Sequence, residues 1–211
     1  MTADGAGVGR PGALVCDLDG VLRLWDAADL TALDRAYGLA AGTLAGAAFR
    51  EERLVPAVTG RVTDEEWRAA VAADLAGPCG SAERSGELVE RWGRQPARVD
   101  ERVLALLNAA ARRMPVALLT NATTRLEADL AALGLDTALD ATVVSTARIG
   151  VAKPDPRAYL AAAERLGVAP RRCLFVDDTA ANLPGARAVG MAVHHYRHVD
   201  GLRALLEPST G

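Results

Sequence analysis

Five short apolar runs that end in polar residues are spread along the chain, and segments with helical patterns lie between them. Segments 125–134, 156–167 and 180–190 are examples of these helical patterns. Alternation of strand-like and helix-like segments predicts an α/β fold with an open parallel sheet covered by helices on both faces. Ligands of such sheets bind beyond the carboxyl ends of the strands. The apolar runs are 13–19, 115–121, 142–145, 173–178 and 192–196.

The first two runs are separated by nearly a hundred residues, which is several times what one crossover helix needs. Helical patterns at about 26–39 and 83–93 lie within this stretch, and Thr63 with Glu66 forms a capping box at the start of another helix. Segment 99–113 has the pattern of the crossover helix itself. We therefore predict a helical insertion directly after the first strand, beside the expected ligand crevice.

These patterns divide the chain into a core and an insertion. We predict an α/β core at residues 13–21 and 99–207, an α-helical cap at residues 22–98 and a flexible N-terminal tail at residues 1–12. The position of the cap beside the crevice favours a lid over the ligand. A subdomain without a role in binding is the alternative.

Composition and charge narrow the classes of partner. The formal net charge is −3 and no block of Lys and Arg is present, so nucleic acid and anionic membrane surfaces are not expected partners. No apolar run approaches the ~18 residues that a membrane span needs. Residues 1–12 lack the apolar middle of a signal peptide, and the three cysteines have no metal-ligand spacing. These features predict a cytoplasmic protein with buried, reduced cysteines.

Carboxylates follow two of the apolar runs. Asp17 and Asp19 end the first run, and residues two apart on an extended segment project to one side. Close carboxylates repel each other unless a cation lies between them, and Mg²⁺ prefers such oxygen ligands. Asp178 ends another run and could supply a further carboxylate, with Asp177 beside it. Helix capping is an equally good explanation for this second pair.

Two further features fit the binding of an oxyanion. Thr120 and Asn121 end the second run, where a hydroxyl and backbone N–H groups can hold an anion or cap the next helix. Lys153 is the only lysine, because 23 of the 24 basic residues are arginine. A lysine is a compact point charge on a thin stem, whereas arginine is a wide planar fork. Lys153 is therefore suited to a crowded anionic site, with chance placement as the alternative.

Taken in order, these segments resemble the motifs of the haloacid dehalogenase superfamily of hydrolases. VCDLDGVL resembles the first motif, LLTNAT the second, GVAKPDPRAY the third and LFVDDTAANLPGARAVGM the fourth. The insertion also falls where one group of the superfamily has a helical cap. The resemblance implies a Rossmann-like sheet with strand order 3-2-1-4-5. It is closest to phosphatases of small metabolites, including the phosphatase domain fused to some epoxide hydrolases.

The resemblance also implies roles for individual residues. Asp17 would be the nucleophile and form an aspartyl-phosphate, and Asp19 would protonate the leaving alcohol and then activate water. Mg²⁺ would be bound by Asp17, by the backbone carbonyl of Asp19 and by Asp178. The phosphoryl oxygens would be held by Thr120, the Asn121 backbone and Lys153, with Asp177 and Asn182 in support.

The expected function is therefore that of a Mg²⁺-dependent phosphatase acting on a small phosphorylated metabolite. The presence of Asp19 argues against dehalogenation, because dehalogenases of this superfamily typically lack the second aspartate. A phosphosugar mutase and a non-catalytic binding or regulatory module are the alternatives. Trp25 either lines the substrate pocket or packs at the hinge. The substrate and the oligomeric state are left open.

Overall fold

The structure is a computed structural model that describes residues 11–207. Residues 1–10, which make up most of the predicted N-terminal tail, lie outside the described residues. In the part that is described, no helix is both long and apolar enough to cross a membrane.

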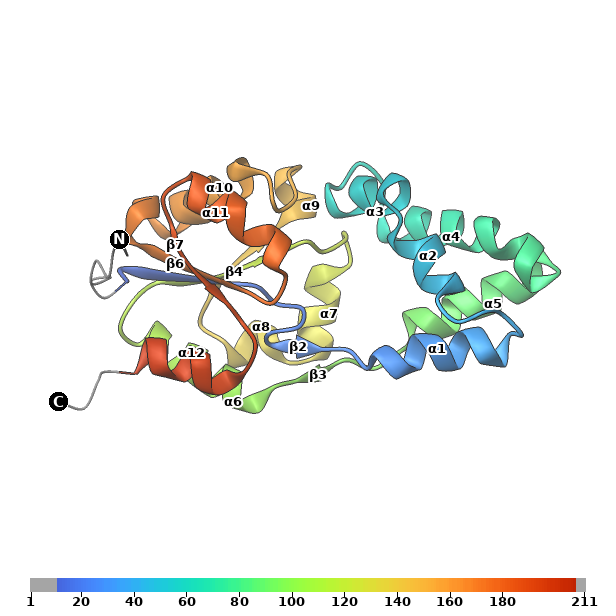
Figure 1. Cartoon of the computed structure of the whole chain (residues 1–211), viewed down its shortest axis with the longest axis horizontal. Coiled ribbons are helices and arrows are strands. Elements are labelled where there is room, and N and C mark those ends of the chain that lie inside the picture. Colours follow the sequence, from blue (N-terminus) through green and yellow to red (C-terminus); the bar gives the residue numbers. More distant parts are fainter. Residues whose placement is uncertain (1–10, 208–211) are drawn as a thin grey trace, which may run out of the picture.

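A five-stranded parallel sheet forms the centre of the core, in the order β5-β4-β1-β6-β7 (Figure 1). Counted along the chain within this sheet, the order is 3-2-1-4-5, so the predicted α/β class and strand order are confirmed. β1 lies in the middle because its Cys16 pairs with Leu118 on one side and Val176 on the other. The strands are β1 (Ala13–Cys16), β4 (Val116–Thr120), β5 (Thr142–Ser145), β6 (Cys173–Asp177) and β7 (Ala192–His195).

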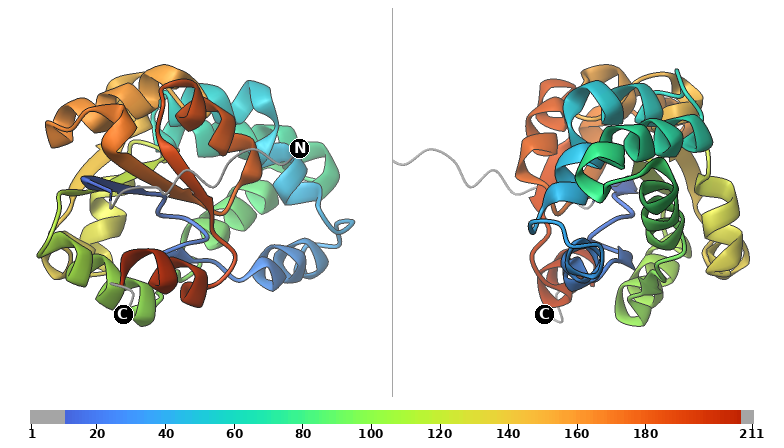
Figure 2. Two further views of the ribbon diagram at one scale, coloured as in Figure 1. Left: turned by 60° about the vertical axis from the view of Figure 1, so that its left-hand side comes forward. Right: turned by 90° about the vertical axis from the view of Figure 1, so that its right-hand side faces the viewer.

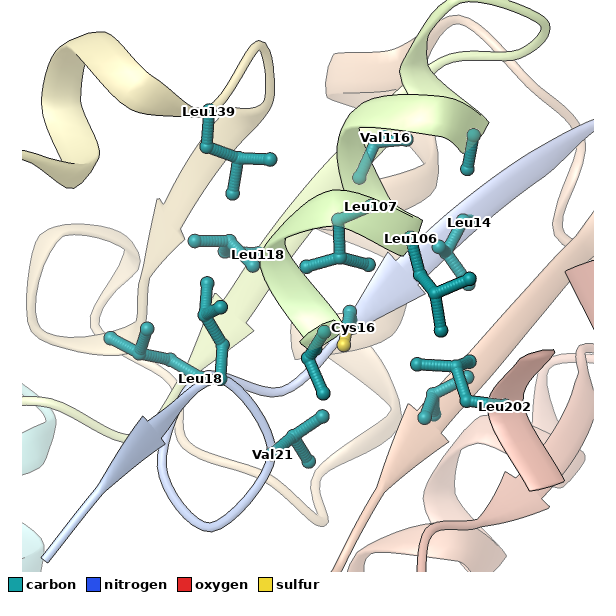
Figure 3. Close-up of a cluster of buried hydrophobic side chains, with 14 of the residues drawn as sticks. Leu14, Cys16, Leu18, Val21, Leu106, Leu107, Val116, Leu118, Leu139 and Leu202 are labelled. Carbon is teal, nitrogen blue, oxygen red and sulfur yellow. The ribbon is translucent and has the colours of Figure 1, made fainter. Parts of the chain in front are cut away.

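Successive side chains of β1 point to opposite faces of the sheet. Leu14 and Cys16 point into one hydrophobic cluster, and Ala13 and Val15 point into the other; all four are fully buried. The first cluster is closed by α6 (Glu101–Ala111), α7 (Leu126–Ala132), α8 (Leu135–Ala138) and α12 (Val199–Leu206) (Figure 3). The second is closed mainly by α10 (Pro156–Leu166) and α11 (Leu183–Ala188). Short helices α9 (Thr146–Ile149), η1 (Pro170–Arg172) and η2 (Ala180–Asn182) complete the core.

Five helices between residues 27 and 93 form a separate layer with its own hydrophobic cluster (Figure 1). On α4, Trp67, Val71 and Leu75 recur every four residues and form its buried face. The predicted capping box is present at the start of α4, with Thr63 and Glu66 bonding reciprocally. These helices are α1 (Ala27–Ala36), α2 (Thr43–Phe49), α3 (Glu51–Val58), α4 (Asp64–Cys79) and α5 (Ala82–Gly93). We refer to them together as the cap.

A short antiparallel ribbon joins the cap to the core. It consists of β2 (Arg23–Leu24) and β3 (Arg98–Val99), one on each segment that crosses between the two layers. The sequence did not predict this ribbon, because strands of two residues carry no readable alternation. The ribbon lies close to both ends of the segment 22–98, and the division of the chain at these ends stays a prediction.

The cap also contacts the core at places far from the ribbon. Asp64, at the start of α4, accepts a hydrogen bond from the Thr123 hydroxyl at 2.7 Å and donates its backbone N–H to the Thr124 hydroxyl at 3.0 Å. Gly60 lies so close to the core that an added Cβ would be 2.2 Å from the carbonyl oxygen of Ala147. Seen from the cap side, the cap helices lie in front of the core (Figure 2). These contacts hold the cap beyond the carboxyl ends of the strands.

Candidate active site at the carboxyl edge of the sheet

Polar side chains from three adjacent strands lie at the carboxyl edge of the sheet. Asp17 follows β1, Thr120 ends β4 and Asp177 ends β6, and β1 pairs with both β4 and β6. The backbone N–H of Asp17 donates to the carbonyl of Val176 at 2.8 Å, which continues the β1–β6 ladder to the edge. The parallel strands therefore deliver these three side chains to neighbouring positions.

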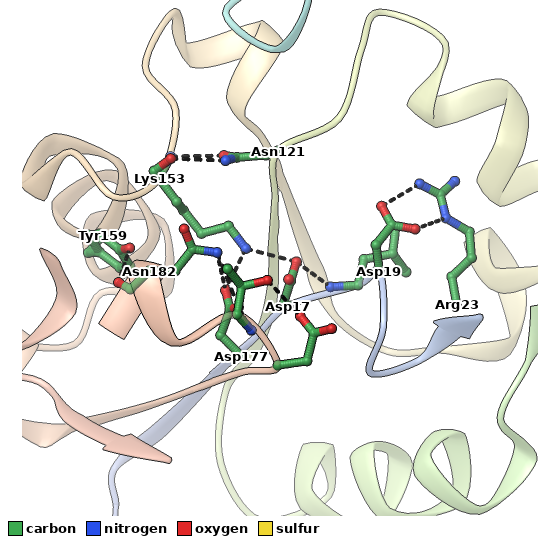
Figure 4. Close-up of polar contacts among 11 residues, drawn as sticks. Asp17, Asp19, Arg23, Asn121, Lys153, Tyr159, Asp177 and Asn182 are labelled. Atoms are coloured by element: carbon green, nitrogen blue, oxygen red, sulfur yellow. Dashed lines mark hydrogen bonds and ion pairs between the residues drawn. The ribbon is translucent and has the colours of Figure 1, made fainter. Parts of the chain in front are cut away.

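Lys153 lies between two of these carboxylates. Its ammonium is 2.8 Å from Oδ1 of Asp17 and 2.8 Å from Oδ2 of Asp177, and its side chain is 1% exposed (Figure 4). Asn121 fixes the loop that carries Lys153, because its side chain accepts from the Lys153 N–H at 2.8 Å and donates to the Lys153 carbonyl at 2.9 Å. The loop after β5 is thereby fastened to the end of β4.

Asp177 is the second carboxylate that holds the Lys153 ammonium. Its carboxylate also accepts from Asn182 Nδ2 at 3.1 and 3.0 Å and from the backbone N–H of Thr179 at 2.8 Å. The Tyr159 hydroxyl in turn donates to the Asn182 carbonyl. Asp177 is fully buried and its two oxygens already have these partners, so it holds the lysine and stabilises the turn at the same time.

The buried charges shift one another's proton affinity. Burial raises the pKa of Asp17 to about 7, although the neighbouring Lys153 ammonium acts in the opposite direction. Burial acts to lower the pKa of Lys153, but the carboxylates of Asp17 and Asp177 outweigh it and the pKa is raised. Lys153 therefore stays protonated at neutral pH, whereas burial makes ionisation of Asp17 less favourable than that of a free carboxyl group.

The acidic groups at this edge fit a divalent cation. Carboxylate oxygens of Asp17, Asp177 and Asp178 lie within 4.8 Å of one another. Oδ1 of Asp17 accepts from Lys153 and from the Leu18 N–H at 2.7 Å, whereas the described residues supply no hydrogen bond to its Oδ2. Asp178 packs against Gly20, where an added Cβ would lie 2.0 Å from its Oδ2. Asp17 and Asp178 thus present oxygen ligands beside the Asp19–Gly20 backbone, a donor set that Mg²⁺ prefers.

Thr120 is placed to receive an anion. Its side chain is buried, and its hydroxyl oxygen has no hydrogen-bond partner among residues 11–207. Buried hydroxyls normally have a partner, so an unpaired one at the site fits a ligand oxygen. Neither Thr120 nor Asn121 caps the next helix, because α7 has Arg125 as its N-cap residue.

Asp19 does not join this cluster. β1 ends at Cys16, so strand alternation does not extend to Asp19, and its carboxylate points toward Arg23 while that of Asp17 points toward Lys153 (Figure 4). Arg23 donates Nε to Oδ1 at 2.7 Å and Nη2 to Oδ2 at 2.8 Å. The Trp25 indole N–H donates to Oδ1 at 2.7 Å.

Trp25 was a candidate on the sequence alone, whereas Arg23 was not. The available signal was an arginine inside the apolar stretch VLRLW, four residues after Asp19. Only 4% of Arg23 is exposed, which an arginine rarely tolerates without a carboxylate partner.

The neighbouring residues His194 and His195 have different surroundings. His195 Nε2 lies 2.8 Å from the Asp178 carbonyl, whereas His194 Nε2 faces Gly201.

Comparison with known proteins agrees with this geometry. The family model of haloacid dehalogenase-like hydrolases matches residues 11–190. The chain belongs to this family. The predicted superfamily is thereby confirmed on a match that includes all four motifs and the cap.

Individual relatives cover the chain to different extents. Phosphatase MT3486 of Mycobacterium tuberculosis is 45% identical over 43% of this chain and 42% of its own length, so the match spans less than half of that relative. A HAD family enzyme of Bacteroides thetaiotaomicron, solved in complex with magnesium and inorganic phosphate, superposes with a TM-score of 0.69 at 19% identity, covering 90% of this chain and 95% of the other. L-2-haloacid dehalogenase of Xanthobacter autotrophicus superposes with a TM-score of 0.62 at 27% identity, covering 87% and 76%.

Proposed function

We propose that this protein is a Mg²⁺-dependent phosphatase that hydrolyses a small phosphomonoester through an aspartyl-phosphate on Asp17. The observation that supports this most directly is the buried Asp17–Lys153–Asp177 cluster beside the Asp178 carboxylate. Such a cluster offers a nucleophile, a fixed ammonium and a cation site within one small volume. Phosphoryl transfer depends mainly on these elements, because its catalysis is largely positioning and charge stabilisation.

In the first step, the Asp17 carboxylate attacks phosphorus and the bond from phosphorus to the leaving oxygen breaks. Asp19, in its protonated form, gives its proton to that oxygen, which leaves as an alcohol. In the second step, water attacks phosphorus and gives a proton to the Asp19 carboxylate. The bond between phosphorus and Asp17 breaks, so phosphate leaves and both residues return to their starting states.

The phosphoryl group would be held by Lys153 and Thr120. An ammonium has three N–H donors, and Asp17 and Asp177 take two of those of Lys153, so the third is available for a phosphoryl oxygen. The unpaired Thr120 hydroxyl supplies another contact. The Asn121 side chain would act indirectly, because it fixes the loop that carries Lys153.

Mg²⁺ would be held by Asp17, Asp178 and the backbone carbonyl of Asp19. When bound, it would offset the negative charge of the carboxylates and of the phosphoryl oxygens. Asp177 would contribute through Lys153, since its oxygens already accept hydrogen bonds from Lys153, Asn182 and Thr179.

Two comparisons bear on the reaction class. The relative that shares 45% identity is described as a phosphatase, and Asp19 supplies the acid for an alcohol that dehalogenation does not need. The similarity to a dehalogenase makes chloropropionic acid a useful negative substrate. A small phosphorylated metabolite is the substrate class that we propose, and a sugar phosphate mutase is the alternative that uses the same intermediate.

The test is phosphate release from a panel of sugar phosphates, nucleotides and para-nitrophenyl phosphate, with and without Mg²⁺. Native protein and Asp17→Asn are compared. Release that requires both the metal and Asp17 supports the proposal. No release from any member contradicts it, and conversion of a sugar phosphate to its isomer with a bisphosphate activator would favour the mutase.

A further inference from the structure

Three N–H groups from the segment that leads from β1 into the cap hold the carboxylate of Asp19. This segment includes β2 of the ribbon, which we call the hinge ribbon. Arg23 supplies two of them, at 2.7 and 2.8 Å, and the Trp25 indole supplies the third at 2.7 Å. We propose that Arg23 and Trp25 are positioning residues that aim Asp19, so that one remaining position on Oδ2 carries the transferred proton. This inference rests on the proposed phosphatase function.

The number of acceptor positions on the Asp19 carboxylate indicates which oxygen can carry the proton. A carboxylate has about four lone-pair positions, two on each oxygen. Oδ1 of Asp19 accepts from Arg23 Nε and from Trp25 Nε1, so both of its positions are filled. Oδ2 accepts from Arg23 Nη2 only, among the residues that the structure describes. One position on Oδ2 is thus left, and the proton that Asp19 gives to the leaving oxygen and later takes from water would occupy it.

The donors themselves are held firmly. Arg23 is buried, lies in β2 of the hinge ribbon and directs its Nη1 to Oδ2 of Asp129 at 3.3 Å. Asp129 is held in turn by Arg125, which also donates to the carbonyl of Gly93 at the end of the cap. Arginine presents its donors in a rigid fork, so this arrangement fixes the plane of the Asp19 carboxylate as well as its place.

Trp25 adds a directional contact and little packing. Its side chain is 49% exposed, and one face lies 5.2 Å from the Arg23 guanidinium. Replacement of its indole by a phenyl ring would keep an aromatic ring beside Arg23 and remove the N–H that bonds Asp19. Because the residue is half exposed, this substitution has little effect on folding, whereas substitution of buried Arg23 risks a loss of structure.

In the first step, the aim of Asp19 matters only where the leaving group needs a proton. The second step, in which water gives a proton to Asp19, is the same for every ester. An alkyl phosphate leaves as an alcohol and depends on the acid, whereas para-nitrophenolate leaves readily without one. General acid–base catalysis contributes about 100- to 10,000-fold, so a misaimed acid should cost on the order of 10-fold for an alkyl ester. The ratio of kcat/KM for the alkyl ester to kcat/KM for the aryl ester therefore separates a misplaced Asp19 carboxylate from general damage to the site.

The experiment compares kcat/KM for the best sugar phosphate of the panel with kcat/KM for para-nitrophenyl phosphate, at saturating Mg²⁺. This quantity covers the first step and excludes the second step that both esters share. The variants are Trp25→Phe, Asp19→Asn, the double variant and Trp92→Phe. Trp92 lies in the cap, and the same substitution there changes no contact with Asp19. Arg23→Lys is measured as well, with its melting temperature, as a second test of the fork.

We expect Trp25→Phe to lower kcat/KM for the sugar phosphate about 10-fold while changing kcat/KM for the aryl ester less than about 2-fold. Trp92→Phe should leave the ratio as in the native protein. In the Asp19→Asn background, Trp25→Phe should have no further effect, because a positioning residue acts only through its target.

The inference would be overturned if Trp25→Phe lowered both esters equally or changed neither. A further loss in the Asp19→Asn background would also overturn it. Each of these results leaves the phosphatase proposal standing. Absence of turnover by the native protein would overturn the phosphatase proposal and this inference together. The two failures are therefore distinguished by the native protein alone.

Discussion

The ammonium of Lys153 lies 2.8 Å from Oδ1 of Asp17, in a position where the lysine side chain is almost fully buried. A second carboxylate, Asp177, lies at the same distance from the ammonium on another side. The centroid of the Phe175 ring lies 5.7 Å from the ammonium. A chain that uses arginine at 23 other positions thus places its one lysine between two carboxylates, where we expect too little space for the wider guanidinium.

Lys153→Arg should therefore fold but lose most phosphatase activity. The wider guanidinium cannot take the place of the ammonium without displacing Asp17 or Asp177, and the N–H aimed at the phosphoryl oxygen is lost. Removal of a single charge-stabilising donor of this kind costs about 100- to 1,000-fold in kcat, and we expect a loss of at least about 100-fold. Steady-state phosphate release, together with circular dichroism as a check of folding, measures this.

Lys153→Met is the matched variant, because it keeps a thin stem and removes the charge together with its N–H donors. Arg157→Lys is the control for the exchange itself, since Arg157 is largely exposed and pairs only with Asp155 among the described residues. Near-native turnover by Lys153→Arg would show that the site accepts a planar cation, and the steric explanation for the lysine would then be wrong.

The sheet could be predicted from the sequence because its three central strands, β1, β4 and β6, are runs of buried side chains. β6 is one example, since all five residues of Cys173–Asp177 are buried and the run stands out in the chain. The order of the strands came from the resemblance to a known family. The apolar runs alone do not determine which strands are neighbours.

The surroundings of Asp19 could not be predicted in this way. Its partners depend on a turn at Gly20 that brings Arg23 back beside Asp19, and hydrophobic periodicity carries no information about such a turn. The position of Asp17 was easier to predict, because Asp17 comes immediately after the last residue of β1. The binding partners of Asn121 also escaped prediction: its side chain holds the Lys153 loop, a contact across 32 positions of the chain.

Gly20→Ala should weaken Mg²⁺-dependent activity. Gly20 has φ of 77°, and a Cβ there would meet Oδ2 of Asp178 at 2.0 Å, so Asp178 would have to move. We expect the Mg²⁺ concentration for half-maximal activity to rise on the order of 10-fold, as loss of a ligand contact typically does. A Mg²⁺ titration of phosphate release gives this value.

Gly38→Ala is the control for backbone strain. Gly38 has φ of 74°, almost the same as Gly20, but lies in the cap with no atom within 4 Å of an added Cβ. Both substitutions carry the cost of a left-handed alanine, about 1 to 2 kcal/mol, and both should lower the melting temperature. If Gly38→Ala raised the Mg²⁺ requirement as much as Gly20→Ala, the contact with Asp178 would not be the cause.

The stabilisation of the protein by Mg²⁺ should depend on pH through Asp17. Burial raises the pKa of Asp17 to about 7 from its usual 3.8, so the folded state binds this proton more tightly than the unfolded state. In the absence of metal, this group alone makes the protein less stable as pH rises from about 4 to about 7, because ionisation of Asp17 then has a cost in the folded state. Mg²⁺ requires the ionised carboxylate, so its stabilising effect should grow over the same range and level off above about pH 7.

Thermal unfolding at about pH 5.5 and about pH 8, with and without excess Mg²⁺, tests this expectation. The increase in melting temperature on addition of Mg²⁺ should be larger at the higher pH, and Asp17→Asn should abolish the difference between the two conditions. A neutral asparagine has no proton to lose and is a weaker ligand for Mg²⁺ than a carboxylate. A Mg²⁺ effect of the same size at both pH values in the native protein would mean that Asp17 is already ionised at the lower pH. The Lys153 ammonium would then outweigh burial in setting its pKa.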